Sequence, residues 1–411
     1  MSPTDIVFFV YAFLALYMSC LFAVIYIPNR KKMFNHPQFK HEPVSIVIPC
    51  YNEAKHIGNT IESLLSLDWP KKMIEIIIVD DRSSDDSVKI ARRYARKYKN
   101  VKVIVNKINS GGAAEPCNIG IDAAKYNYVA ITDADSRPAP DVLNKMIGFL
   151  QRQKMTAAVT CSVLVDKPPK KFIQKLQQVE YIAIAFSRKL LDFIDAVYVT
   201  PGPFALYKKK ILKKIGKFDT SNLTQDIEIV WALKKAGYNS RMSLDARVYT
   251  SSPSKWKIWW KQRTRWNIGG IQTIIKYKKE FLKRNILGSF ILPFFSVSLF
   301  VGVLGLTILL NRLINRLAVL AISAKYSLYA NTIAYNTAGF TFSNSVINFF
   351  FISLFAVGLF FTFLGLTVLD EFNMNLKDML TILFYFAIYL SIYPFLLVSS
   401  IFKFAKGNYS W

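Results

Sequence analysis

Residues suited to disulfides and zinc sites are scarce in this chain. Its 411 residues include only four cysteines and three histidines. The cysteines form no C-x-x-C pair, and His36, His41 and His56 have no metal-ligand spacing. We therefore expect neither a disulfide framework nor a zinc centre.

Charged side chains are absent from four apolar stretches, Ile6–Ile27, Ile286–Leu310, Val346–Leu369 and Met379–Ile401. Each is long enough for a helix that crosses a bilayer core of about 30 Å. The first stretch has no basic segment before it and no small-residue cleavage site, so it predicts a retained membrane helix in residues 1–28 instead of a signal peptide. The other stretches predict a C-terminal membrane region of about three spans in residues 286–411.

Acidic side chains are outnumbered by basic ones. The chain has 53 Lys and Arg against 27 Asp and Glu, a net charge of +26, and most of the excess lies between Asn29 and Arg284. Basic clusters beside membrane helices mark the cytoplasmic side and attract anionic lipid head groups. The pattern predicts an integral protein of the plasma membrane, with residues 29–254 as a cytoplasmic domain and segment 312–345 on the outer side. No nucleic-acid-binding motif accompanies the positive charge, so a bilayer, and no nucleic acid, is the expected partner.

The middle of the chain alternates β-branched runs with helical patterns. The predicted strands are Val44–Pro49, Ile74–Val79, Val101–Val105 and Tyr128–Thr132, and the predicted helices are Ala54–Leu67 and Ser84–Lys97. Continuous apolar strands separated by helices indicate an α/β domain with a mostly parallel sheet covered on both faces. Ligands of such sheets bind beyond the carboxyl ends of the strands. That rim receives the residues that follow the strands, which include Tyr51, Glu53, Asp80, Asp81, Asp133 and Asp135.

Asp133 and Asp135 form a D-x-D motif at this rim. Carboxylate oxygens suit a hard divalent cation, Mg²⁺ or Mn²⁺, whose other ligands are phosphates and water. Such an ion would neutralise a diphosphate leaving group. A solvated acidic loop is the alternative, but the position of the motif directly after an apolar strand favours the metal-ligand interpretation.

Three further residues at the rim suit a nucleotide. Asp81 can accept hydrogen bonds from a uracil or a ribose, and Tyr51 can lie on the base. Glu53 can accept from the ribose, or it can lie in the first turn of the following helix, where the helix dipole favours an acid. Both interpretations of Glu53 stay open.

A second acidic motif, Thr224-Gln225-Asp226, precedes the helical pattern Ile227–Lys235. A positioned carboxylate such as that of Asp226 is the ordinary base for a hydroxyl that loses its proton as it attacks. The alternative is a helix cap that uses Thr224 and Asp226, and the two roles are compatible.

Tryptophans and cationic residues are interleaved between Trp256 and Trp266. This pattern predicts amphipathic helices at the membrane interface over residues 255–285, with indoles in the head-group zone. Within this segment, Arg265 with Gln262 can hold a diphosphate, and the Trp266 indole can stack on a sugar.

Taken in order, these motifs resemble those of the processive inverting family-2 glycosyltransferases, which include cellulose, chitin, hyaluronan and poly-N-acetylglucosamine synthases. The family pattern is a lone Asp after an early strand, a D-x-D, a T-E-D and a Q-x-x-R-W. The matching residues are Asp81, Asp133/Asp135, Thr224-Gln225-Asp226 and Gln262-x-x-Arg265-Trp266. The segment Tyr198–Leu206, with Gly202 and Pro203, also resembles the family's acceptor-facing loop.

The resemblance implies a GT-A fold, a UDP-sugar donor, Mg²⁺ or Mn²⁺, and inversion at the anomeric carbon. Asp226 would be the base, and Asp133 and Asp135 would hold the metal. The donor would be bound by Tyr51, Glu53, Asp81, Asp133, Gln262 and Arg265. The glycan or lipid-linked acceptor would be bound by Gly202, Pro203, Thr224, Gln225 and Trp266.

Two positions depart from the family pattern. Gln225 replaces the usual Glu of T-E-D, which keeps a hydrogen-bonding side chain but removes a charge near the acceptor. In Asn109–Asn118, which resembles the family's G-K-A-x-A-L-N segment, Gly112 stands where a lysine is common. A lysine there would meet the donor phosphates, so donor identity or affinity is expected to differ unless Lys107 substitutes for it.

Three functions are compatible with these residues. The first is a synthase that extends a polysaccharide and exports it, which the Q-x-x-R-W motif favours. The second is an enzyme that adds a single hexosyl or N-acetylhexosaminyl unit to a polyprenyl phosphate or a lipid-linked glycan, which the small membrane part favours. The third is an inactive, transferase-like membrane scaffold, which Gln225 and Gly112 would explain. Few spans also suggest an oligomer or an accessory membrane subunit that completes a pore.

Overall fold

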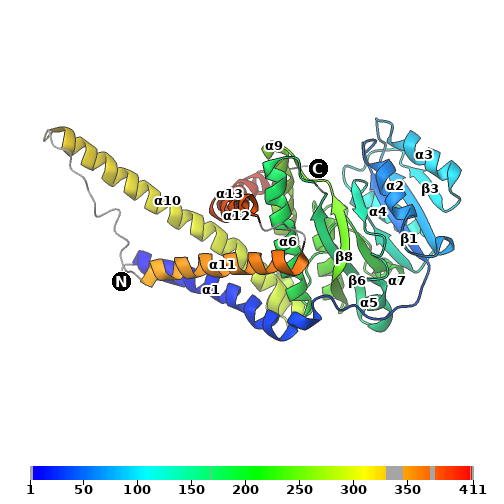
Figure 1. Ribbon diagram of the computed structural model, residues 1–411, viewed down its shortest axis with the longest axis horizontal. Coiled ribbons are helices and arrows are strands. Elements are labelled where there is room, and N and C mark those ends of the chain that lie inside the picture. Colours follow the sequence, from blue (N-terminus) through cyan, green and yellow to red (C-terminus); the bar gives the residue numbers. More distant parts are fainter. Residues whose placement is uncertain (1–2, 167, 330–345, 371–374, 408, 410–411) are drawn as a thin grey trace.

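The computed structural model describes residues 3–166, 168–329, 346–370, 375–407 and 409. Figure 1 shows an α/β domain and a group of long helices that extends from one side of it. The two parts meet along α6 (Phe172–Asp192) and α9 (Trp256–Tyr277).

The α/β domain contains one eight-stranded sheet with the order β3-β2-β1-β4-β7-β6-β8-β5. The strands are β1 (Val44–Cys50), β2 (Ile74–Asp80), β3 (Val101–Val105), β4 (Tyr128–Ile131), β5 (Ser136–Pro138), β6 (Thr156–Val165), β7 (Ala205–Lys208) and β8 (Asn239–Thr250). β1 is parallel to β2 and β4, β2 to β3, and β6 to β8. β7 is antiparallel to β4 and β6, and β5 is antiparallel to β8. This mixed, mostly parallel sheet with helices confirms the predicted GT-A-like α/β fold.

The first four strands lie where the sequence predicts them, with ends that differ by at most one residue. Helices α2 (Ile57–Leu65) and α3 (Ser87–Lys97) begin later than predicted. The backbone amides before α2 donate instead to the start of α3 and the loop before it, Glu53 N to Ser87 Oγ at 2.8 Å and Ala54 N to Asp85 Oδ2 at 3.0 Å. Glu53 therefore precedes α2 and does not lie in its first turn.

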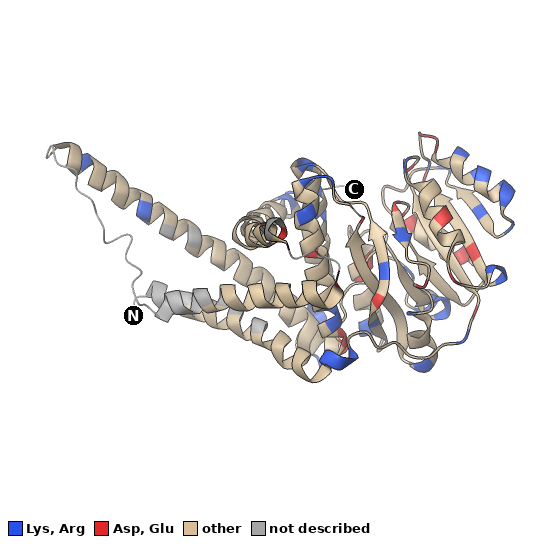
Figure 2. Cartoon of the chain, in the orientation of Figure 1, with Lys and Arg blue, Asp and Glu red and all other residues tan. Residues whose placement is uncertain are grey.

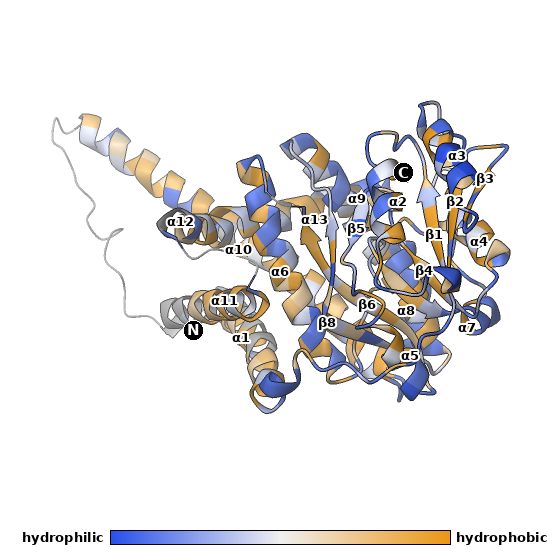
Figure 3. Ribbon diagram, turned by 45° about the vertical axis from the view of Figure 1, so that its right-hand side comes forward, coloured by the Kyte–Doolittle hydropathy of each residue, from blue (hydrophilic) through white to orange (hydrophobic). Residues whose placement is uncertain are grey.

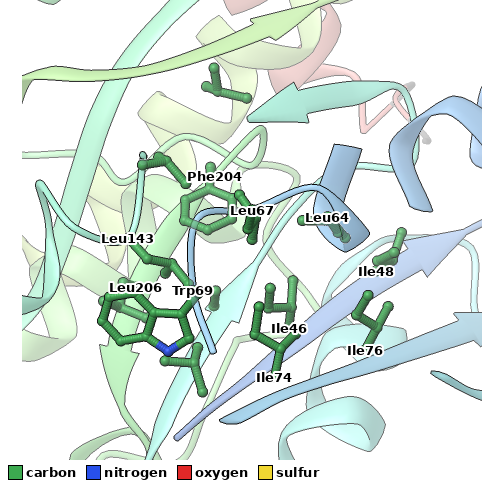
Figure 4. Close-up of a cluster of buried hydrophobic side chains, with 14 of the residues drawn as sticks. Ile46, Ile48, Leu64, Leu67, Trp69, Ile74, Ile76, Leu143, Phe204 and Leu206 are labelled. Atoms are coloured by element: carbon green, nitrogen blue, oxygen red, sulfur yellow. The ribbon is translucent and has the colours of Figure 1, made fainter. Parts of the chain in front are cut away.

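Both faces of the sheet are covered, as continuous apolar strands require. One face packs against α2, α3 and α5 (Ile147–Arg152), and Figure 4 shows part of this core, including Ile46, Ile48 and Leu64. The other face carries the alternate residue Val47 and packs against α4 (Ala114–Ala123), α7 (Lys209–Lys214) and α8 (Gln225–Lys235). The two cores fix the strands whose carboxyl ends carry the predicted site residues.

The helical part contains α1 (Pro3–Asn29), α10 (Leu292–Tyr329), α11 (Val346–Leu369), α12 (Leu376–Phe384) and α13 (Leu390–Ala405). Two continuous helices of the described residues, Leu287–Tyr329 and Asp378–Ala405, are long and apolar enough to cross a membrane by length and composition. The first of them consists of a short π-helical turn, Leu287–Ile291, followed by α10. In the second, the π-helical turn Tyr385–Tyr389 links α12 to α13. Lys and Arg are concentrated on the α/β domain and its junction with the helices (Figure 2), whereas the helical part is mainly hydrophobic (Figure 3).

The apolar helices do not all run in one direction. α1 and α11 pack side by side, and α10 projects beyond them (Figure 1). The segment Asp378–Ala405 is seen nearly end-on in Figure 1, where α1 and α11 are seen lengthwise, so it runs across them. It packs against α9 and α10.

The helix that begins in the apolar stretch Ile286–Leu310 continues beyond the end of that stretch. We predicted a span that ends at Leu310 and an outer segment from Arg312 to Ser345, but α10 continues to Tyr329. The added residues contain neither Gly nor Pro and are rich in Leu, Ile and Ala, so nothing in them ends the helix. The rest of the predicted outer segment, 330–345, lies outside the described residues.

Candidate functional site

The loops after β1 and β2 form a hydrogen-bonded ledge at the rim of the sheet. Asn52 Oδ1 accepts from Ser84 N at 2.8 Å, and Asn52 N donates to Ser83 Oγ at 2.9 Å. Tyr51 is 53% exposed on this ledge, while Glu53 is half-buried behind it. The geometry leaves the Tyr51 ring open to an aromatic base.

Asp81, directly after β2, is buried, and both of its carboxylate oxygens have partners. Oδ1 accepts from Asn106 Nδ2 at 2.7 Å, and Oδ2 accepts from Ser110 N at 2.9 Å and Ser110 Oγ at 2.8 Å. Asn109 Nδ2 donates to the Asp81 backbone carbonyl at 2.8 Å. Asp81 therefore holds the loop after β3, and a nucleotide would reach its carboxylate only by replacing these contacts.

Asp133 belongs to a cluster of acidic side chains. Burial, with Asp135 and Asp226, raises the pKa of Asp133 to about 8. Burial, with Asp135, raises the pKa of Glu53 to about 7. Asp135 Oδ1 accepts from Thr250 Oγ1 at 3.3 Å, and Ser251 Oγ donates to its Oδ2. The two D-x-D carboxylates thus lie in a region of excess negative charge.

The predicted acceptor loop lies directly against the D-x-D motif. Asp133 N donates to Gly202 O at 3.1 Å, and Thr132 Oγ1 donates to Pro203 O at 2.6 Å. A Cβ atom on Gly202 would lie 2.6 Å from Asp133 Oδ1. Only glycine therefore allows the loop to approach the carboxylate this closely.

A small cavity lies between Asp133 and Asp226. Its lining also includes Cys117, Ile131, Thr200, Pro201, Gly202, Ala205, Tyr207, Phe218 and Gln225. Thr200 N donates to the Asp226 backbone carbonyl at 3.2 Å, which ties the acceptor loop to α8. The structure thus brings together the first D-x-D carboxylate, the predicted acceptor loop and the predicted base.

Asp226 lies in the first turn of α8, and Thr224 occupies the position before the helix. Thr224 is 4% exposed, and its hydroxyl donates to Asn222 Oδ1 at 3.2 Å without capping the helix. A Cβ on Gly269 of α9 would lie 2.2 Å from Thr224 Oγ1, so α9 packs tightly on this loop. The predicted cap hydrogen bond is absent, and the Thr224 side chain shapes the loop instead of lining the cavity.

Two arginines oppose the acidic cluster, Arg188, which is buried, and Arg265, which is half-buried. Burial raises the pKa of Asp226, whereas Arg265 and, to a smaller extent, Arg188 lower it. Arg265 comes from α9 and also counteracts the raised pKa of Asp133. Arg188 of α6 is 4% exposed, and its Nε has no hydrogen-bond partner among the described residues. The predicted base, Asp226, therefore lies close enough to two cations for both to lower its pKa.

Gln262 and Trp266 are both held by Arg263. Arg263 Nη1 donates to Gln262 Oε1 at 2.7 Å, and the Arg263 Cζ atom lies 3.9 Å from the Trp266 ring centroid. Arg263 itself is 1% exposed and pairs with Glu180 of α6 at 2.6 Å. The motif residues of α9 are thus positioned by a residue that the motif does not include.

A divalent cation at this site would need phosphate or water oxygens as ligands in addition to the protein carboxylates. No group of three or more His, Cys, Asp or Glu side chains suited to a metal ion occurs in the part of the chain that the structure describes. Asp133 and Asp135 supply hard oxygen donors, and the raised pKa of Asp133 reflects negative charge that a cation would relieve. Mg²⁺ and Mn²⁺ commonly bind through one or two carboxylates plus phosphates and water.

Sequence reasoning missed Arg188, Glu180 and Arg263. Glu180 and Arg263 are 83 residues apart in the chain, so no local pattern joins them. One signal was available: Glu180 is a lone acid in the apolar run from Val179 to Phe186 of a helix. An isolated charge in such a run requires a partner when the helix is buried.

The comparison with known protein families agrees with the fold. Residues 45–216 match the family described as Glycosyl transferase family 2. This segment, which carries the ledge, the D-x-D motif and the acceptor loop, is a family-2 glycosyltransferase domain. The match ends before Asp226, which lines the same cavity, and before Arg265 of α9, whose charge opposes the raised pKa of Asp226.

The sequence similarity to individual proteins covers more residues than this domain. The chain is 31% identical over 269 residues to a poly-beta-1,6-N-acetyl-D-glucosamine synthase of Staphylococcus epidermidis, covering 65% of this chain and 64% of that protein. It is 28% identical over 243 residues to the probable glycosyltransferase YdaM of Bacillus subtilis, covering 58% of each. The chain thus spans less than two thirds of the length of these relatives.

A solved structure resembles the whole chain. The mannosyltransferase PcManGT from Pyrobaculum calidifontis, in complex with GDP-Man and Mn²⁺, gives a TM-score of 0.62 at 16% identity. The superposition covers 97% of this chain and 99% of that one. At this identity the likeness shows a shared fold, helical part included.

Proposed function

We propose that the protein is a membrane-bound, inverting glycosyltransferase that transfers a hexosyl or N-acetylhexosaminyl unit from a UDP-sugar to a growing polysaccharide. The cavity that joins Asp133, Gly202 and Asp226 carries the proposal, because it unites a donor-side carboxylate, an acceptor loop and a base. The synthase relative in Staphylococcus epidermidis supports a polysaccharide product and makes UDP-N-acetylglucosamine the first donor to test.

Asp226 acts as the base. It takes the proton of the acceptor hydroxyl while that oxygen bonds to the anomeric carbon on the face opposite the leaving group. The bond from the anomeric carbon to the diphosphate breaks, UDP leaves with the electron pair, and the configuration inverts. Burial raises the pKa of Asp226, and Arg265 and Arg188 oppose this rise, which favours the ionised form that a base requires.

The donor lies along the rim of the sheet. Tyr51 stacks on the base, and Glu53 and Asp81 face the nucleoside, Asp81 after release of its loop. Arg265, with Gln262, binds the diphosphate, because a guanidinium matches phosphate oxygens well. Asp133 and Asp135 would hold Mg²⁺ or Mn²⁺, and the cation would supply positive charge to neutralise the diphosphate leaving group.

The acceptor enters from the side of α9. Gly202, Pro203 and Gln225 line its path, Thr224 supports them, and Trp266 stacks on its terminal sugar. We assign residues 255–285 to the membrane interface and α1, α10, α11 and α12–α13 to the plasma membrane. The Lys and Arg residues at the junction (Figure 2) support a cytoplasmic position for the catalytic domain. The growing chain is then exported beside these helices, with a second copy or an accessory subunit if the pore needs it.

One observation favours a second candidate, the transfer of a single sugar to a polyprenyl phosphate or lipid-linked glycan. Asp378–Ala405 runs across α1 and α11, so few helices run together through the bilayer (Figure 1). Such an arrangement offers less wall for a polysaccharide channel than four parallel spans would.

Purified protein in nanodiscs with Mn²⁺ tests the proposal. UDP release and product size are measured with UDP-N-acetylglucosamine, UDP-glucose and UDP-glucuronate in turn. A high-molecular-weight product supports the polymerase. UDP release that depends on added polyprenyl phosphate supports the second candidate. If no donor gives UDP release, both candidate functions are wrong and the result supports an inactive scaffold.

A further inference from the structure

Glu180 is a buried acid in the middle of α6, and each of its carboxylate oxygens has two partners. Oε2 accepts from Arg263 Nη2 at 2.6 Å and from the Tyr389 hydroxyl at 2.7 Å. Oε1 accepts from Arg263 Nε at 3.3 Å and from the Tyr393 hydroxyl. One carboxylate, 4% exposed, therefore joins α6, α9 and the C-terminal apolar helix, Asp378–Ala405.

The same network holds α9 through a second hydrogen bond. Trp259 Nε1 donates to the Tyr389 hydroxyl at 2.6 Å, and both side chains are 0% exposed. Their ring centroids lie 5.1 Å apart, and that of Tyr393 lies 5.8 Å from Trp259. The C-terminal apolar helix thus contacts α9 through oriented polar groups as well as through packing.

Arg263 carries this network to the site. Its Nε and Nη2 donate to Glu180, and its Nη1 donates to Gln262 Oε1 at 2.7 Å. Its guanidinium lies over the Trp266 ring at 3.9 Å. With three of its nitrogens engaged, the planar fork fits in one orientation, and this orientation fixes the side chains of Gln262 and Trp266.

Stability alone is a poor reason for this arrangement. Removing two charges from water offsets most of their attraction, so apolar residues of similar volume generally stabilise a core as well or better. A fully partnered buried network instead favours one geometry over its alternatives. Glu180, Arg263, Tyr389 and Tyr393 are therefore better explained by the geometry that they impose on α9.

We propose that Glu180 and Arg263 are positioning residues that hold Trp266 against the acceptor, and that the C-terminal apolar helix keeps them in place through Tyr389 and Tyr393. The proposal rests on the function proposed above. It assigns the C-terminal helix a role in acceptor binding at a site to which it contributes no residue of the motifs. Arg265, which faces Asp226 and Asp133, is left to serve the donor side.

The test compares three variants in nanodiscs with Mn²⁺, using the donor that wild type accepts. Glu180→Leu/Arg263→Met replaces the ion pair by apolar side chains of similar length, so that no charge is left buried alone. Tyr393→Phe removes one hydroxyl from Glu180. Tyr385→Phe is the matched control, because Tyr385 stacks on Tyr389 at 5.3 Å but its hydroxyl makes no hydrogen bond within the described residues.

We expect the KM for an added oligosaccharide acceptor to rise about tenfold in the double variant and about threefold in Tyr393→Phe, with shorter products. The Kd for UDP with Mn²⁺ should change by a clearly smaller factor, because Arg265 still binds the diphosphate when Arg263 no longer holds Gln262. The acceptor KM of Tyr385→Phe should match wild type. Unchanged acceptor KM in both test variants would overturn the positioning role, and so would an equal loss of UDP affinity. If wild type releases no UDP from any donor, the proposed function fails and this inference fails with it.

Discussion

Arg263 and Arg265 lie two residues apart on α9 and serve different parts of the molecule. Two residues correspond to about 200° around a helix, so the two side chains leave it on nearly opposite sides. Arg263 pairs with Glu180 and contacts the C-terminal apolar helix through a shared network. Arg265 faces the acids of the cleft, Asp226 first and Asp133 second. One side of α9 is thus bound to the apolar helices, and the opposite side is directed toward the acidic residues of the cleft.

The difference teaches that charge type alone does not reveal a role. Arg263 is buried and Arg265 is half-buried, and both lie near acidic side chains. Arg263 meets its acid in a bidentate pair with tyrosine hydroxyls around it, which leaves no capacity for a phosphate. Arg265 instead faces Asp226 and Asp133, two acids that line the small cavity, and we propose that it binds the diphosphate there. Variants on either side of α9 can break or sharpen this comparison.

The largest effect is expected on the cleft side, from Asp226→Asn. The amide has nearly the same shape but cannot accept the acceptor proton, so kcat should fall by about 100- to 10,000-fold. Binding of UDP with Mn²⁺, measured by calorimetry, should be close to that of wild type. Normal turnover in this variant would show that Asp226 is not the base.

Arg265→Lys should have the next largest effect. The point charge of lysine cannot form two parallel hydrogen bonds to phosphate oxygens, and loss of such stabilisation typically costs about 100-fold in kcat. Lys261→Ala, at an exposed position of the same helix, is the control. Steady-state UDP release distinguishes the two, and an equal result for both would contradict a donor role for Arg265.

Substitutions at two neighbouring glycines of α9, Gly269 and Gly270, distinguish the effect of a steric contact from the effect of helix propensity. In Gly269→Ala the new Cβ would lie 2.2 Å from Thr224 Oγ1, so α9 must move away from the loop that carries Asp226. We expect a loss of about 1–3 kcal/mol in stability and a clear loss of activity. In Gly270→Ala nothing lies within 4 Å of the new Cβ, and the gain in helix propensity should stabilise the protein by about 0.5–1 kcal/mol. Thermal unfolding and UDP release test both, and a lower Tm for Gly270→Ala than for Gly269→Ala would contradict the packing.

The smallest effect concerns Lys234, away from the cleft. Burial lowers the pKa of Lys234 from its usual 10.5 to about 8, and its Nζ donates to the Asp195 carbonyl at 2.5 Å. Above about pH 8 the folded protein releases a proton that the unfolded chain still holds, so stability should rise with pH, by about 1–2 kcal/mol from about pH 7.5 to about 9.5. Below about pH 8 the full cost of burying the charge is present.

Lys234→Met is the control for this pH dependence. It removes the buried ammonium group, so the variant should show a flatter dependence of unfolding on pH and greater stability at about pH 7.5. Chemical denaturation at the two pH values measures both chains. An equal slope in the two would show that Lys234 is not the group that titrates.

Much of the donor side follows from local sequence. Strands β1 to β4 were predicted to within a residue at each end, because continuous apolar runs between helical patterns have few alternatives. Parallel pairing then brings the ends of β1, β2 and β4 to one rim, so the neighbourhood of Tyr51, Asp81 and Asp133 could be predicted without coordinates. The start of α2 could not, because Ser87 and Asp85 from another loop bind the amides that precede it.

The acceptor side depends on packing between distant segments. Thr224 and Asp226 were recognised from their motif, but the direction of the Thr224 hydroxyl is set by Asn222 and by the close approach of Gly269. The extent of α10 beyond Leu310 was also underestimated, since the end of a charge-free run is not the end of a helix. Both cases need information from outside the local window.

The sequence by itself determined the class of fold, the apolar segments and the residue types that reach the rim, since these depend on periodicity and chain order. Only the tertiary structure decided which side of α9 each arginine faces, that Asp81 is engaged by its neighbouring loop, and that Glu180 meets Arg263, Tyr389 and Tyr393. The physical reason is that a buried charge is stable only with partners around it, and these partners come from segments up to 213 residues apart.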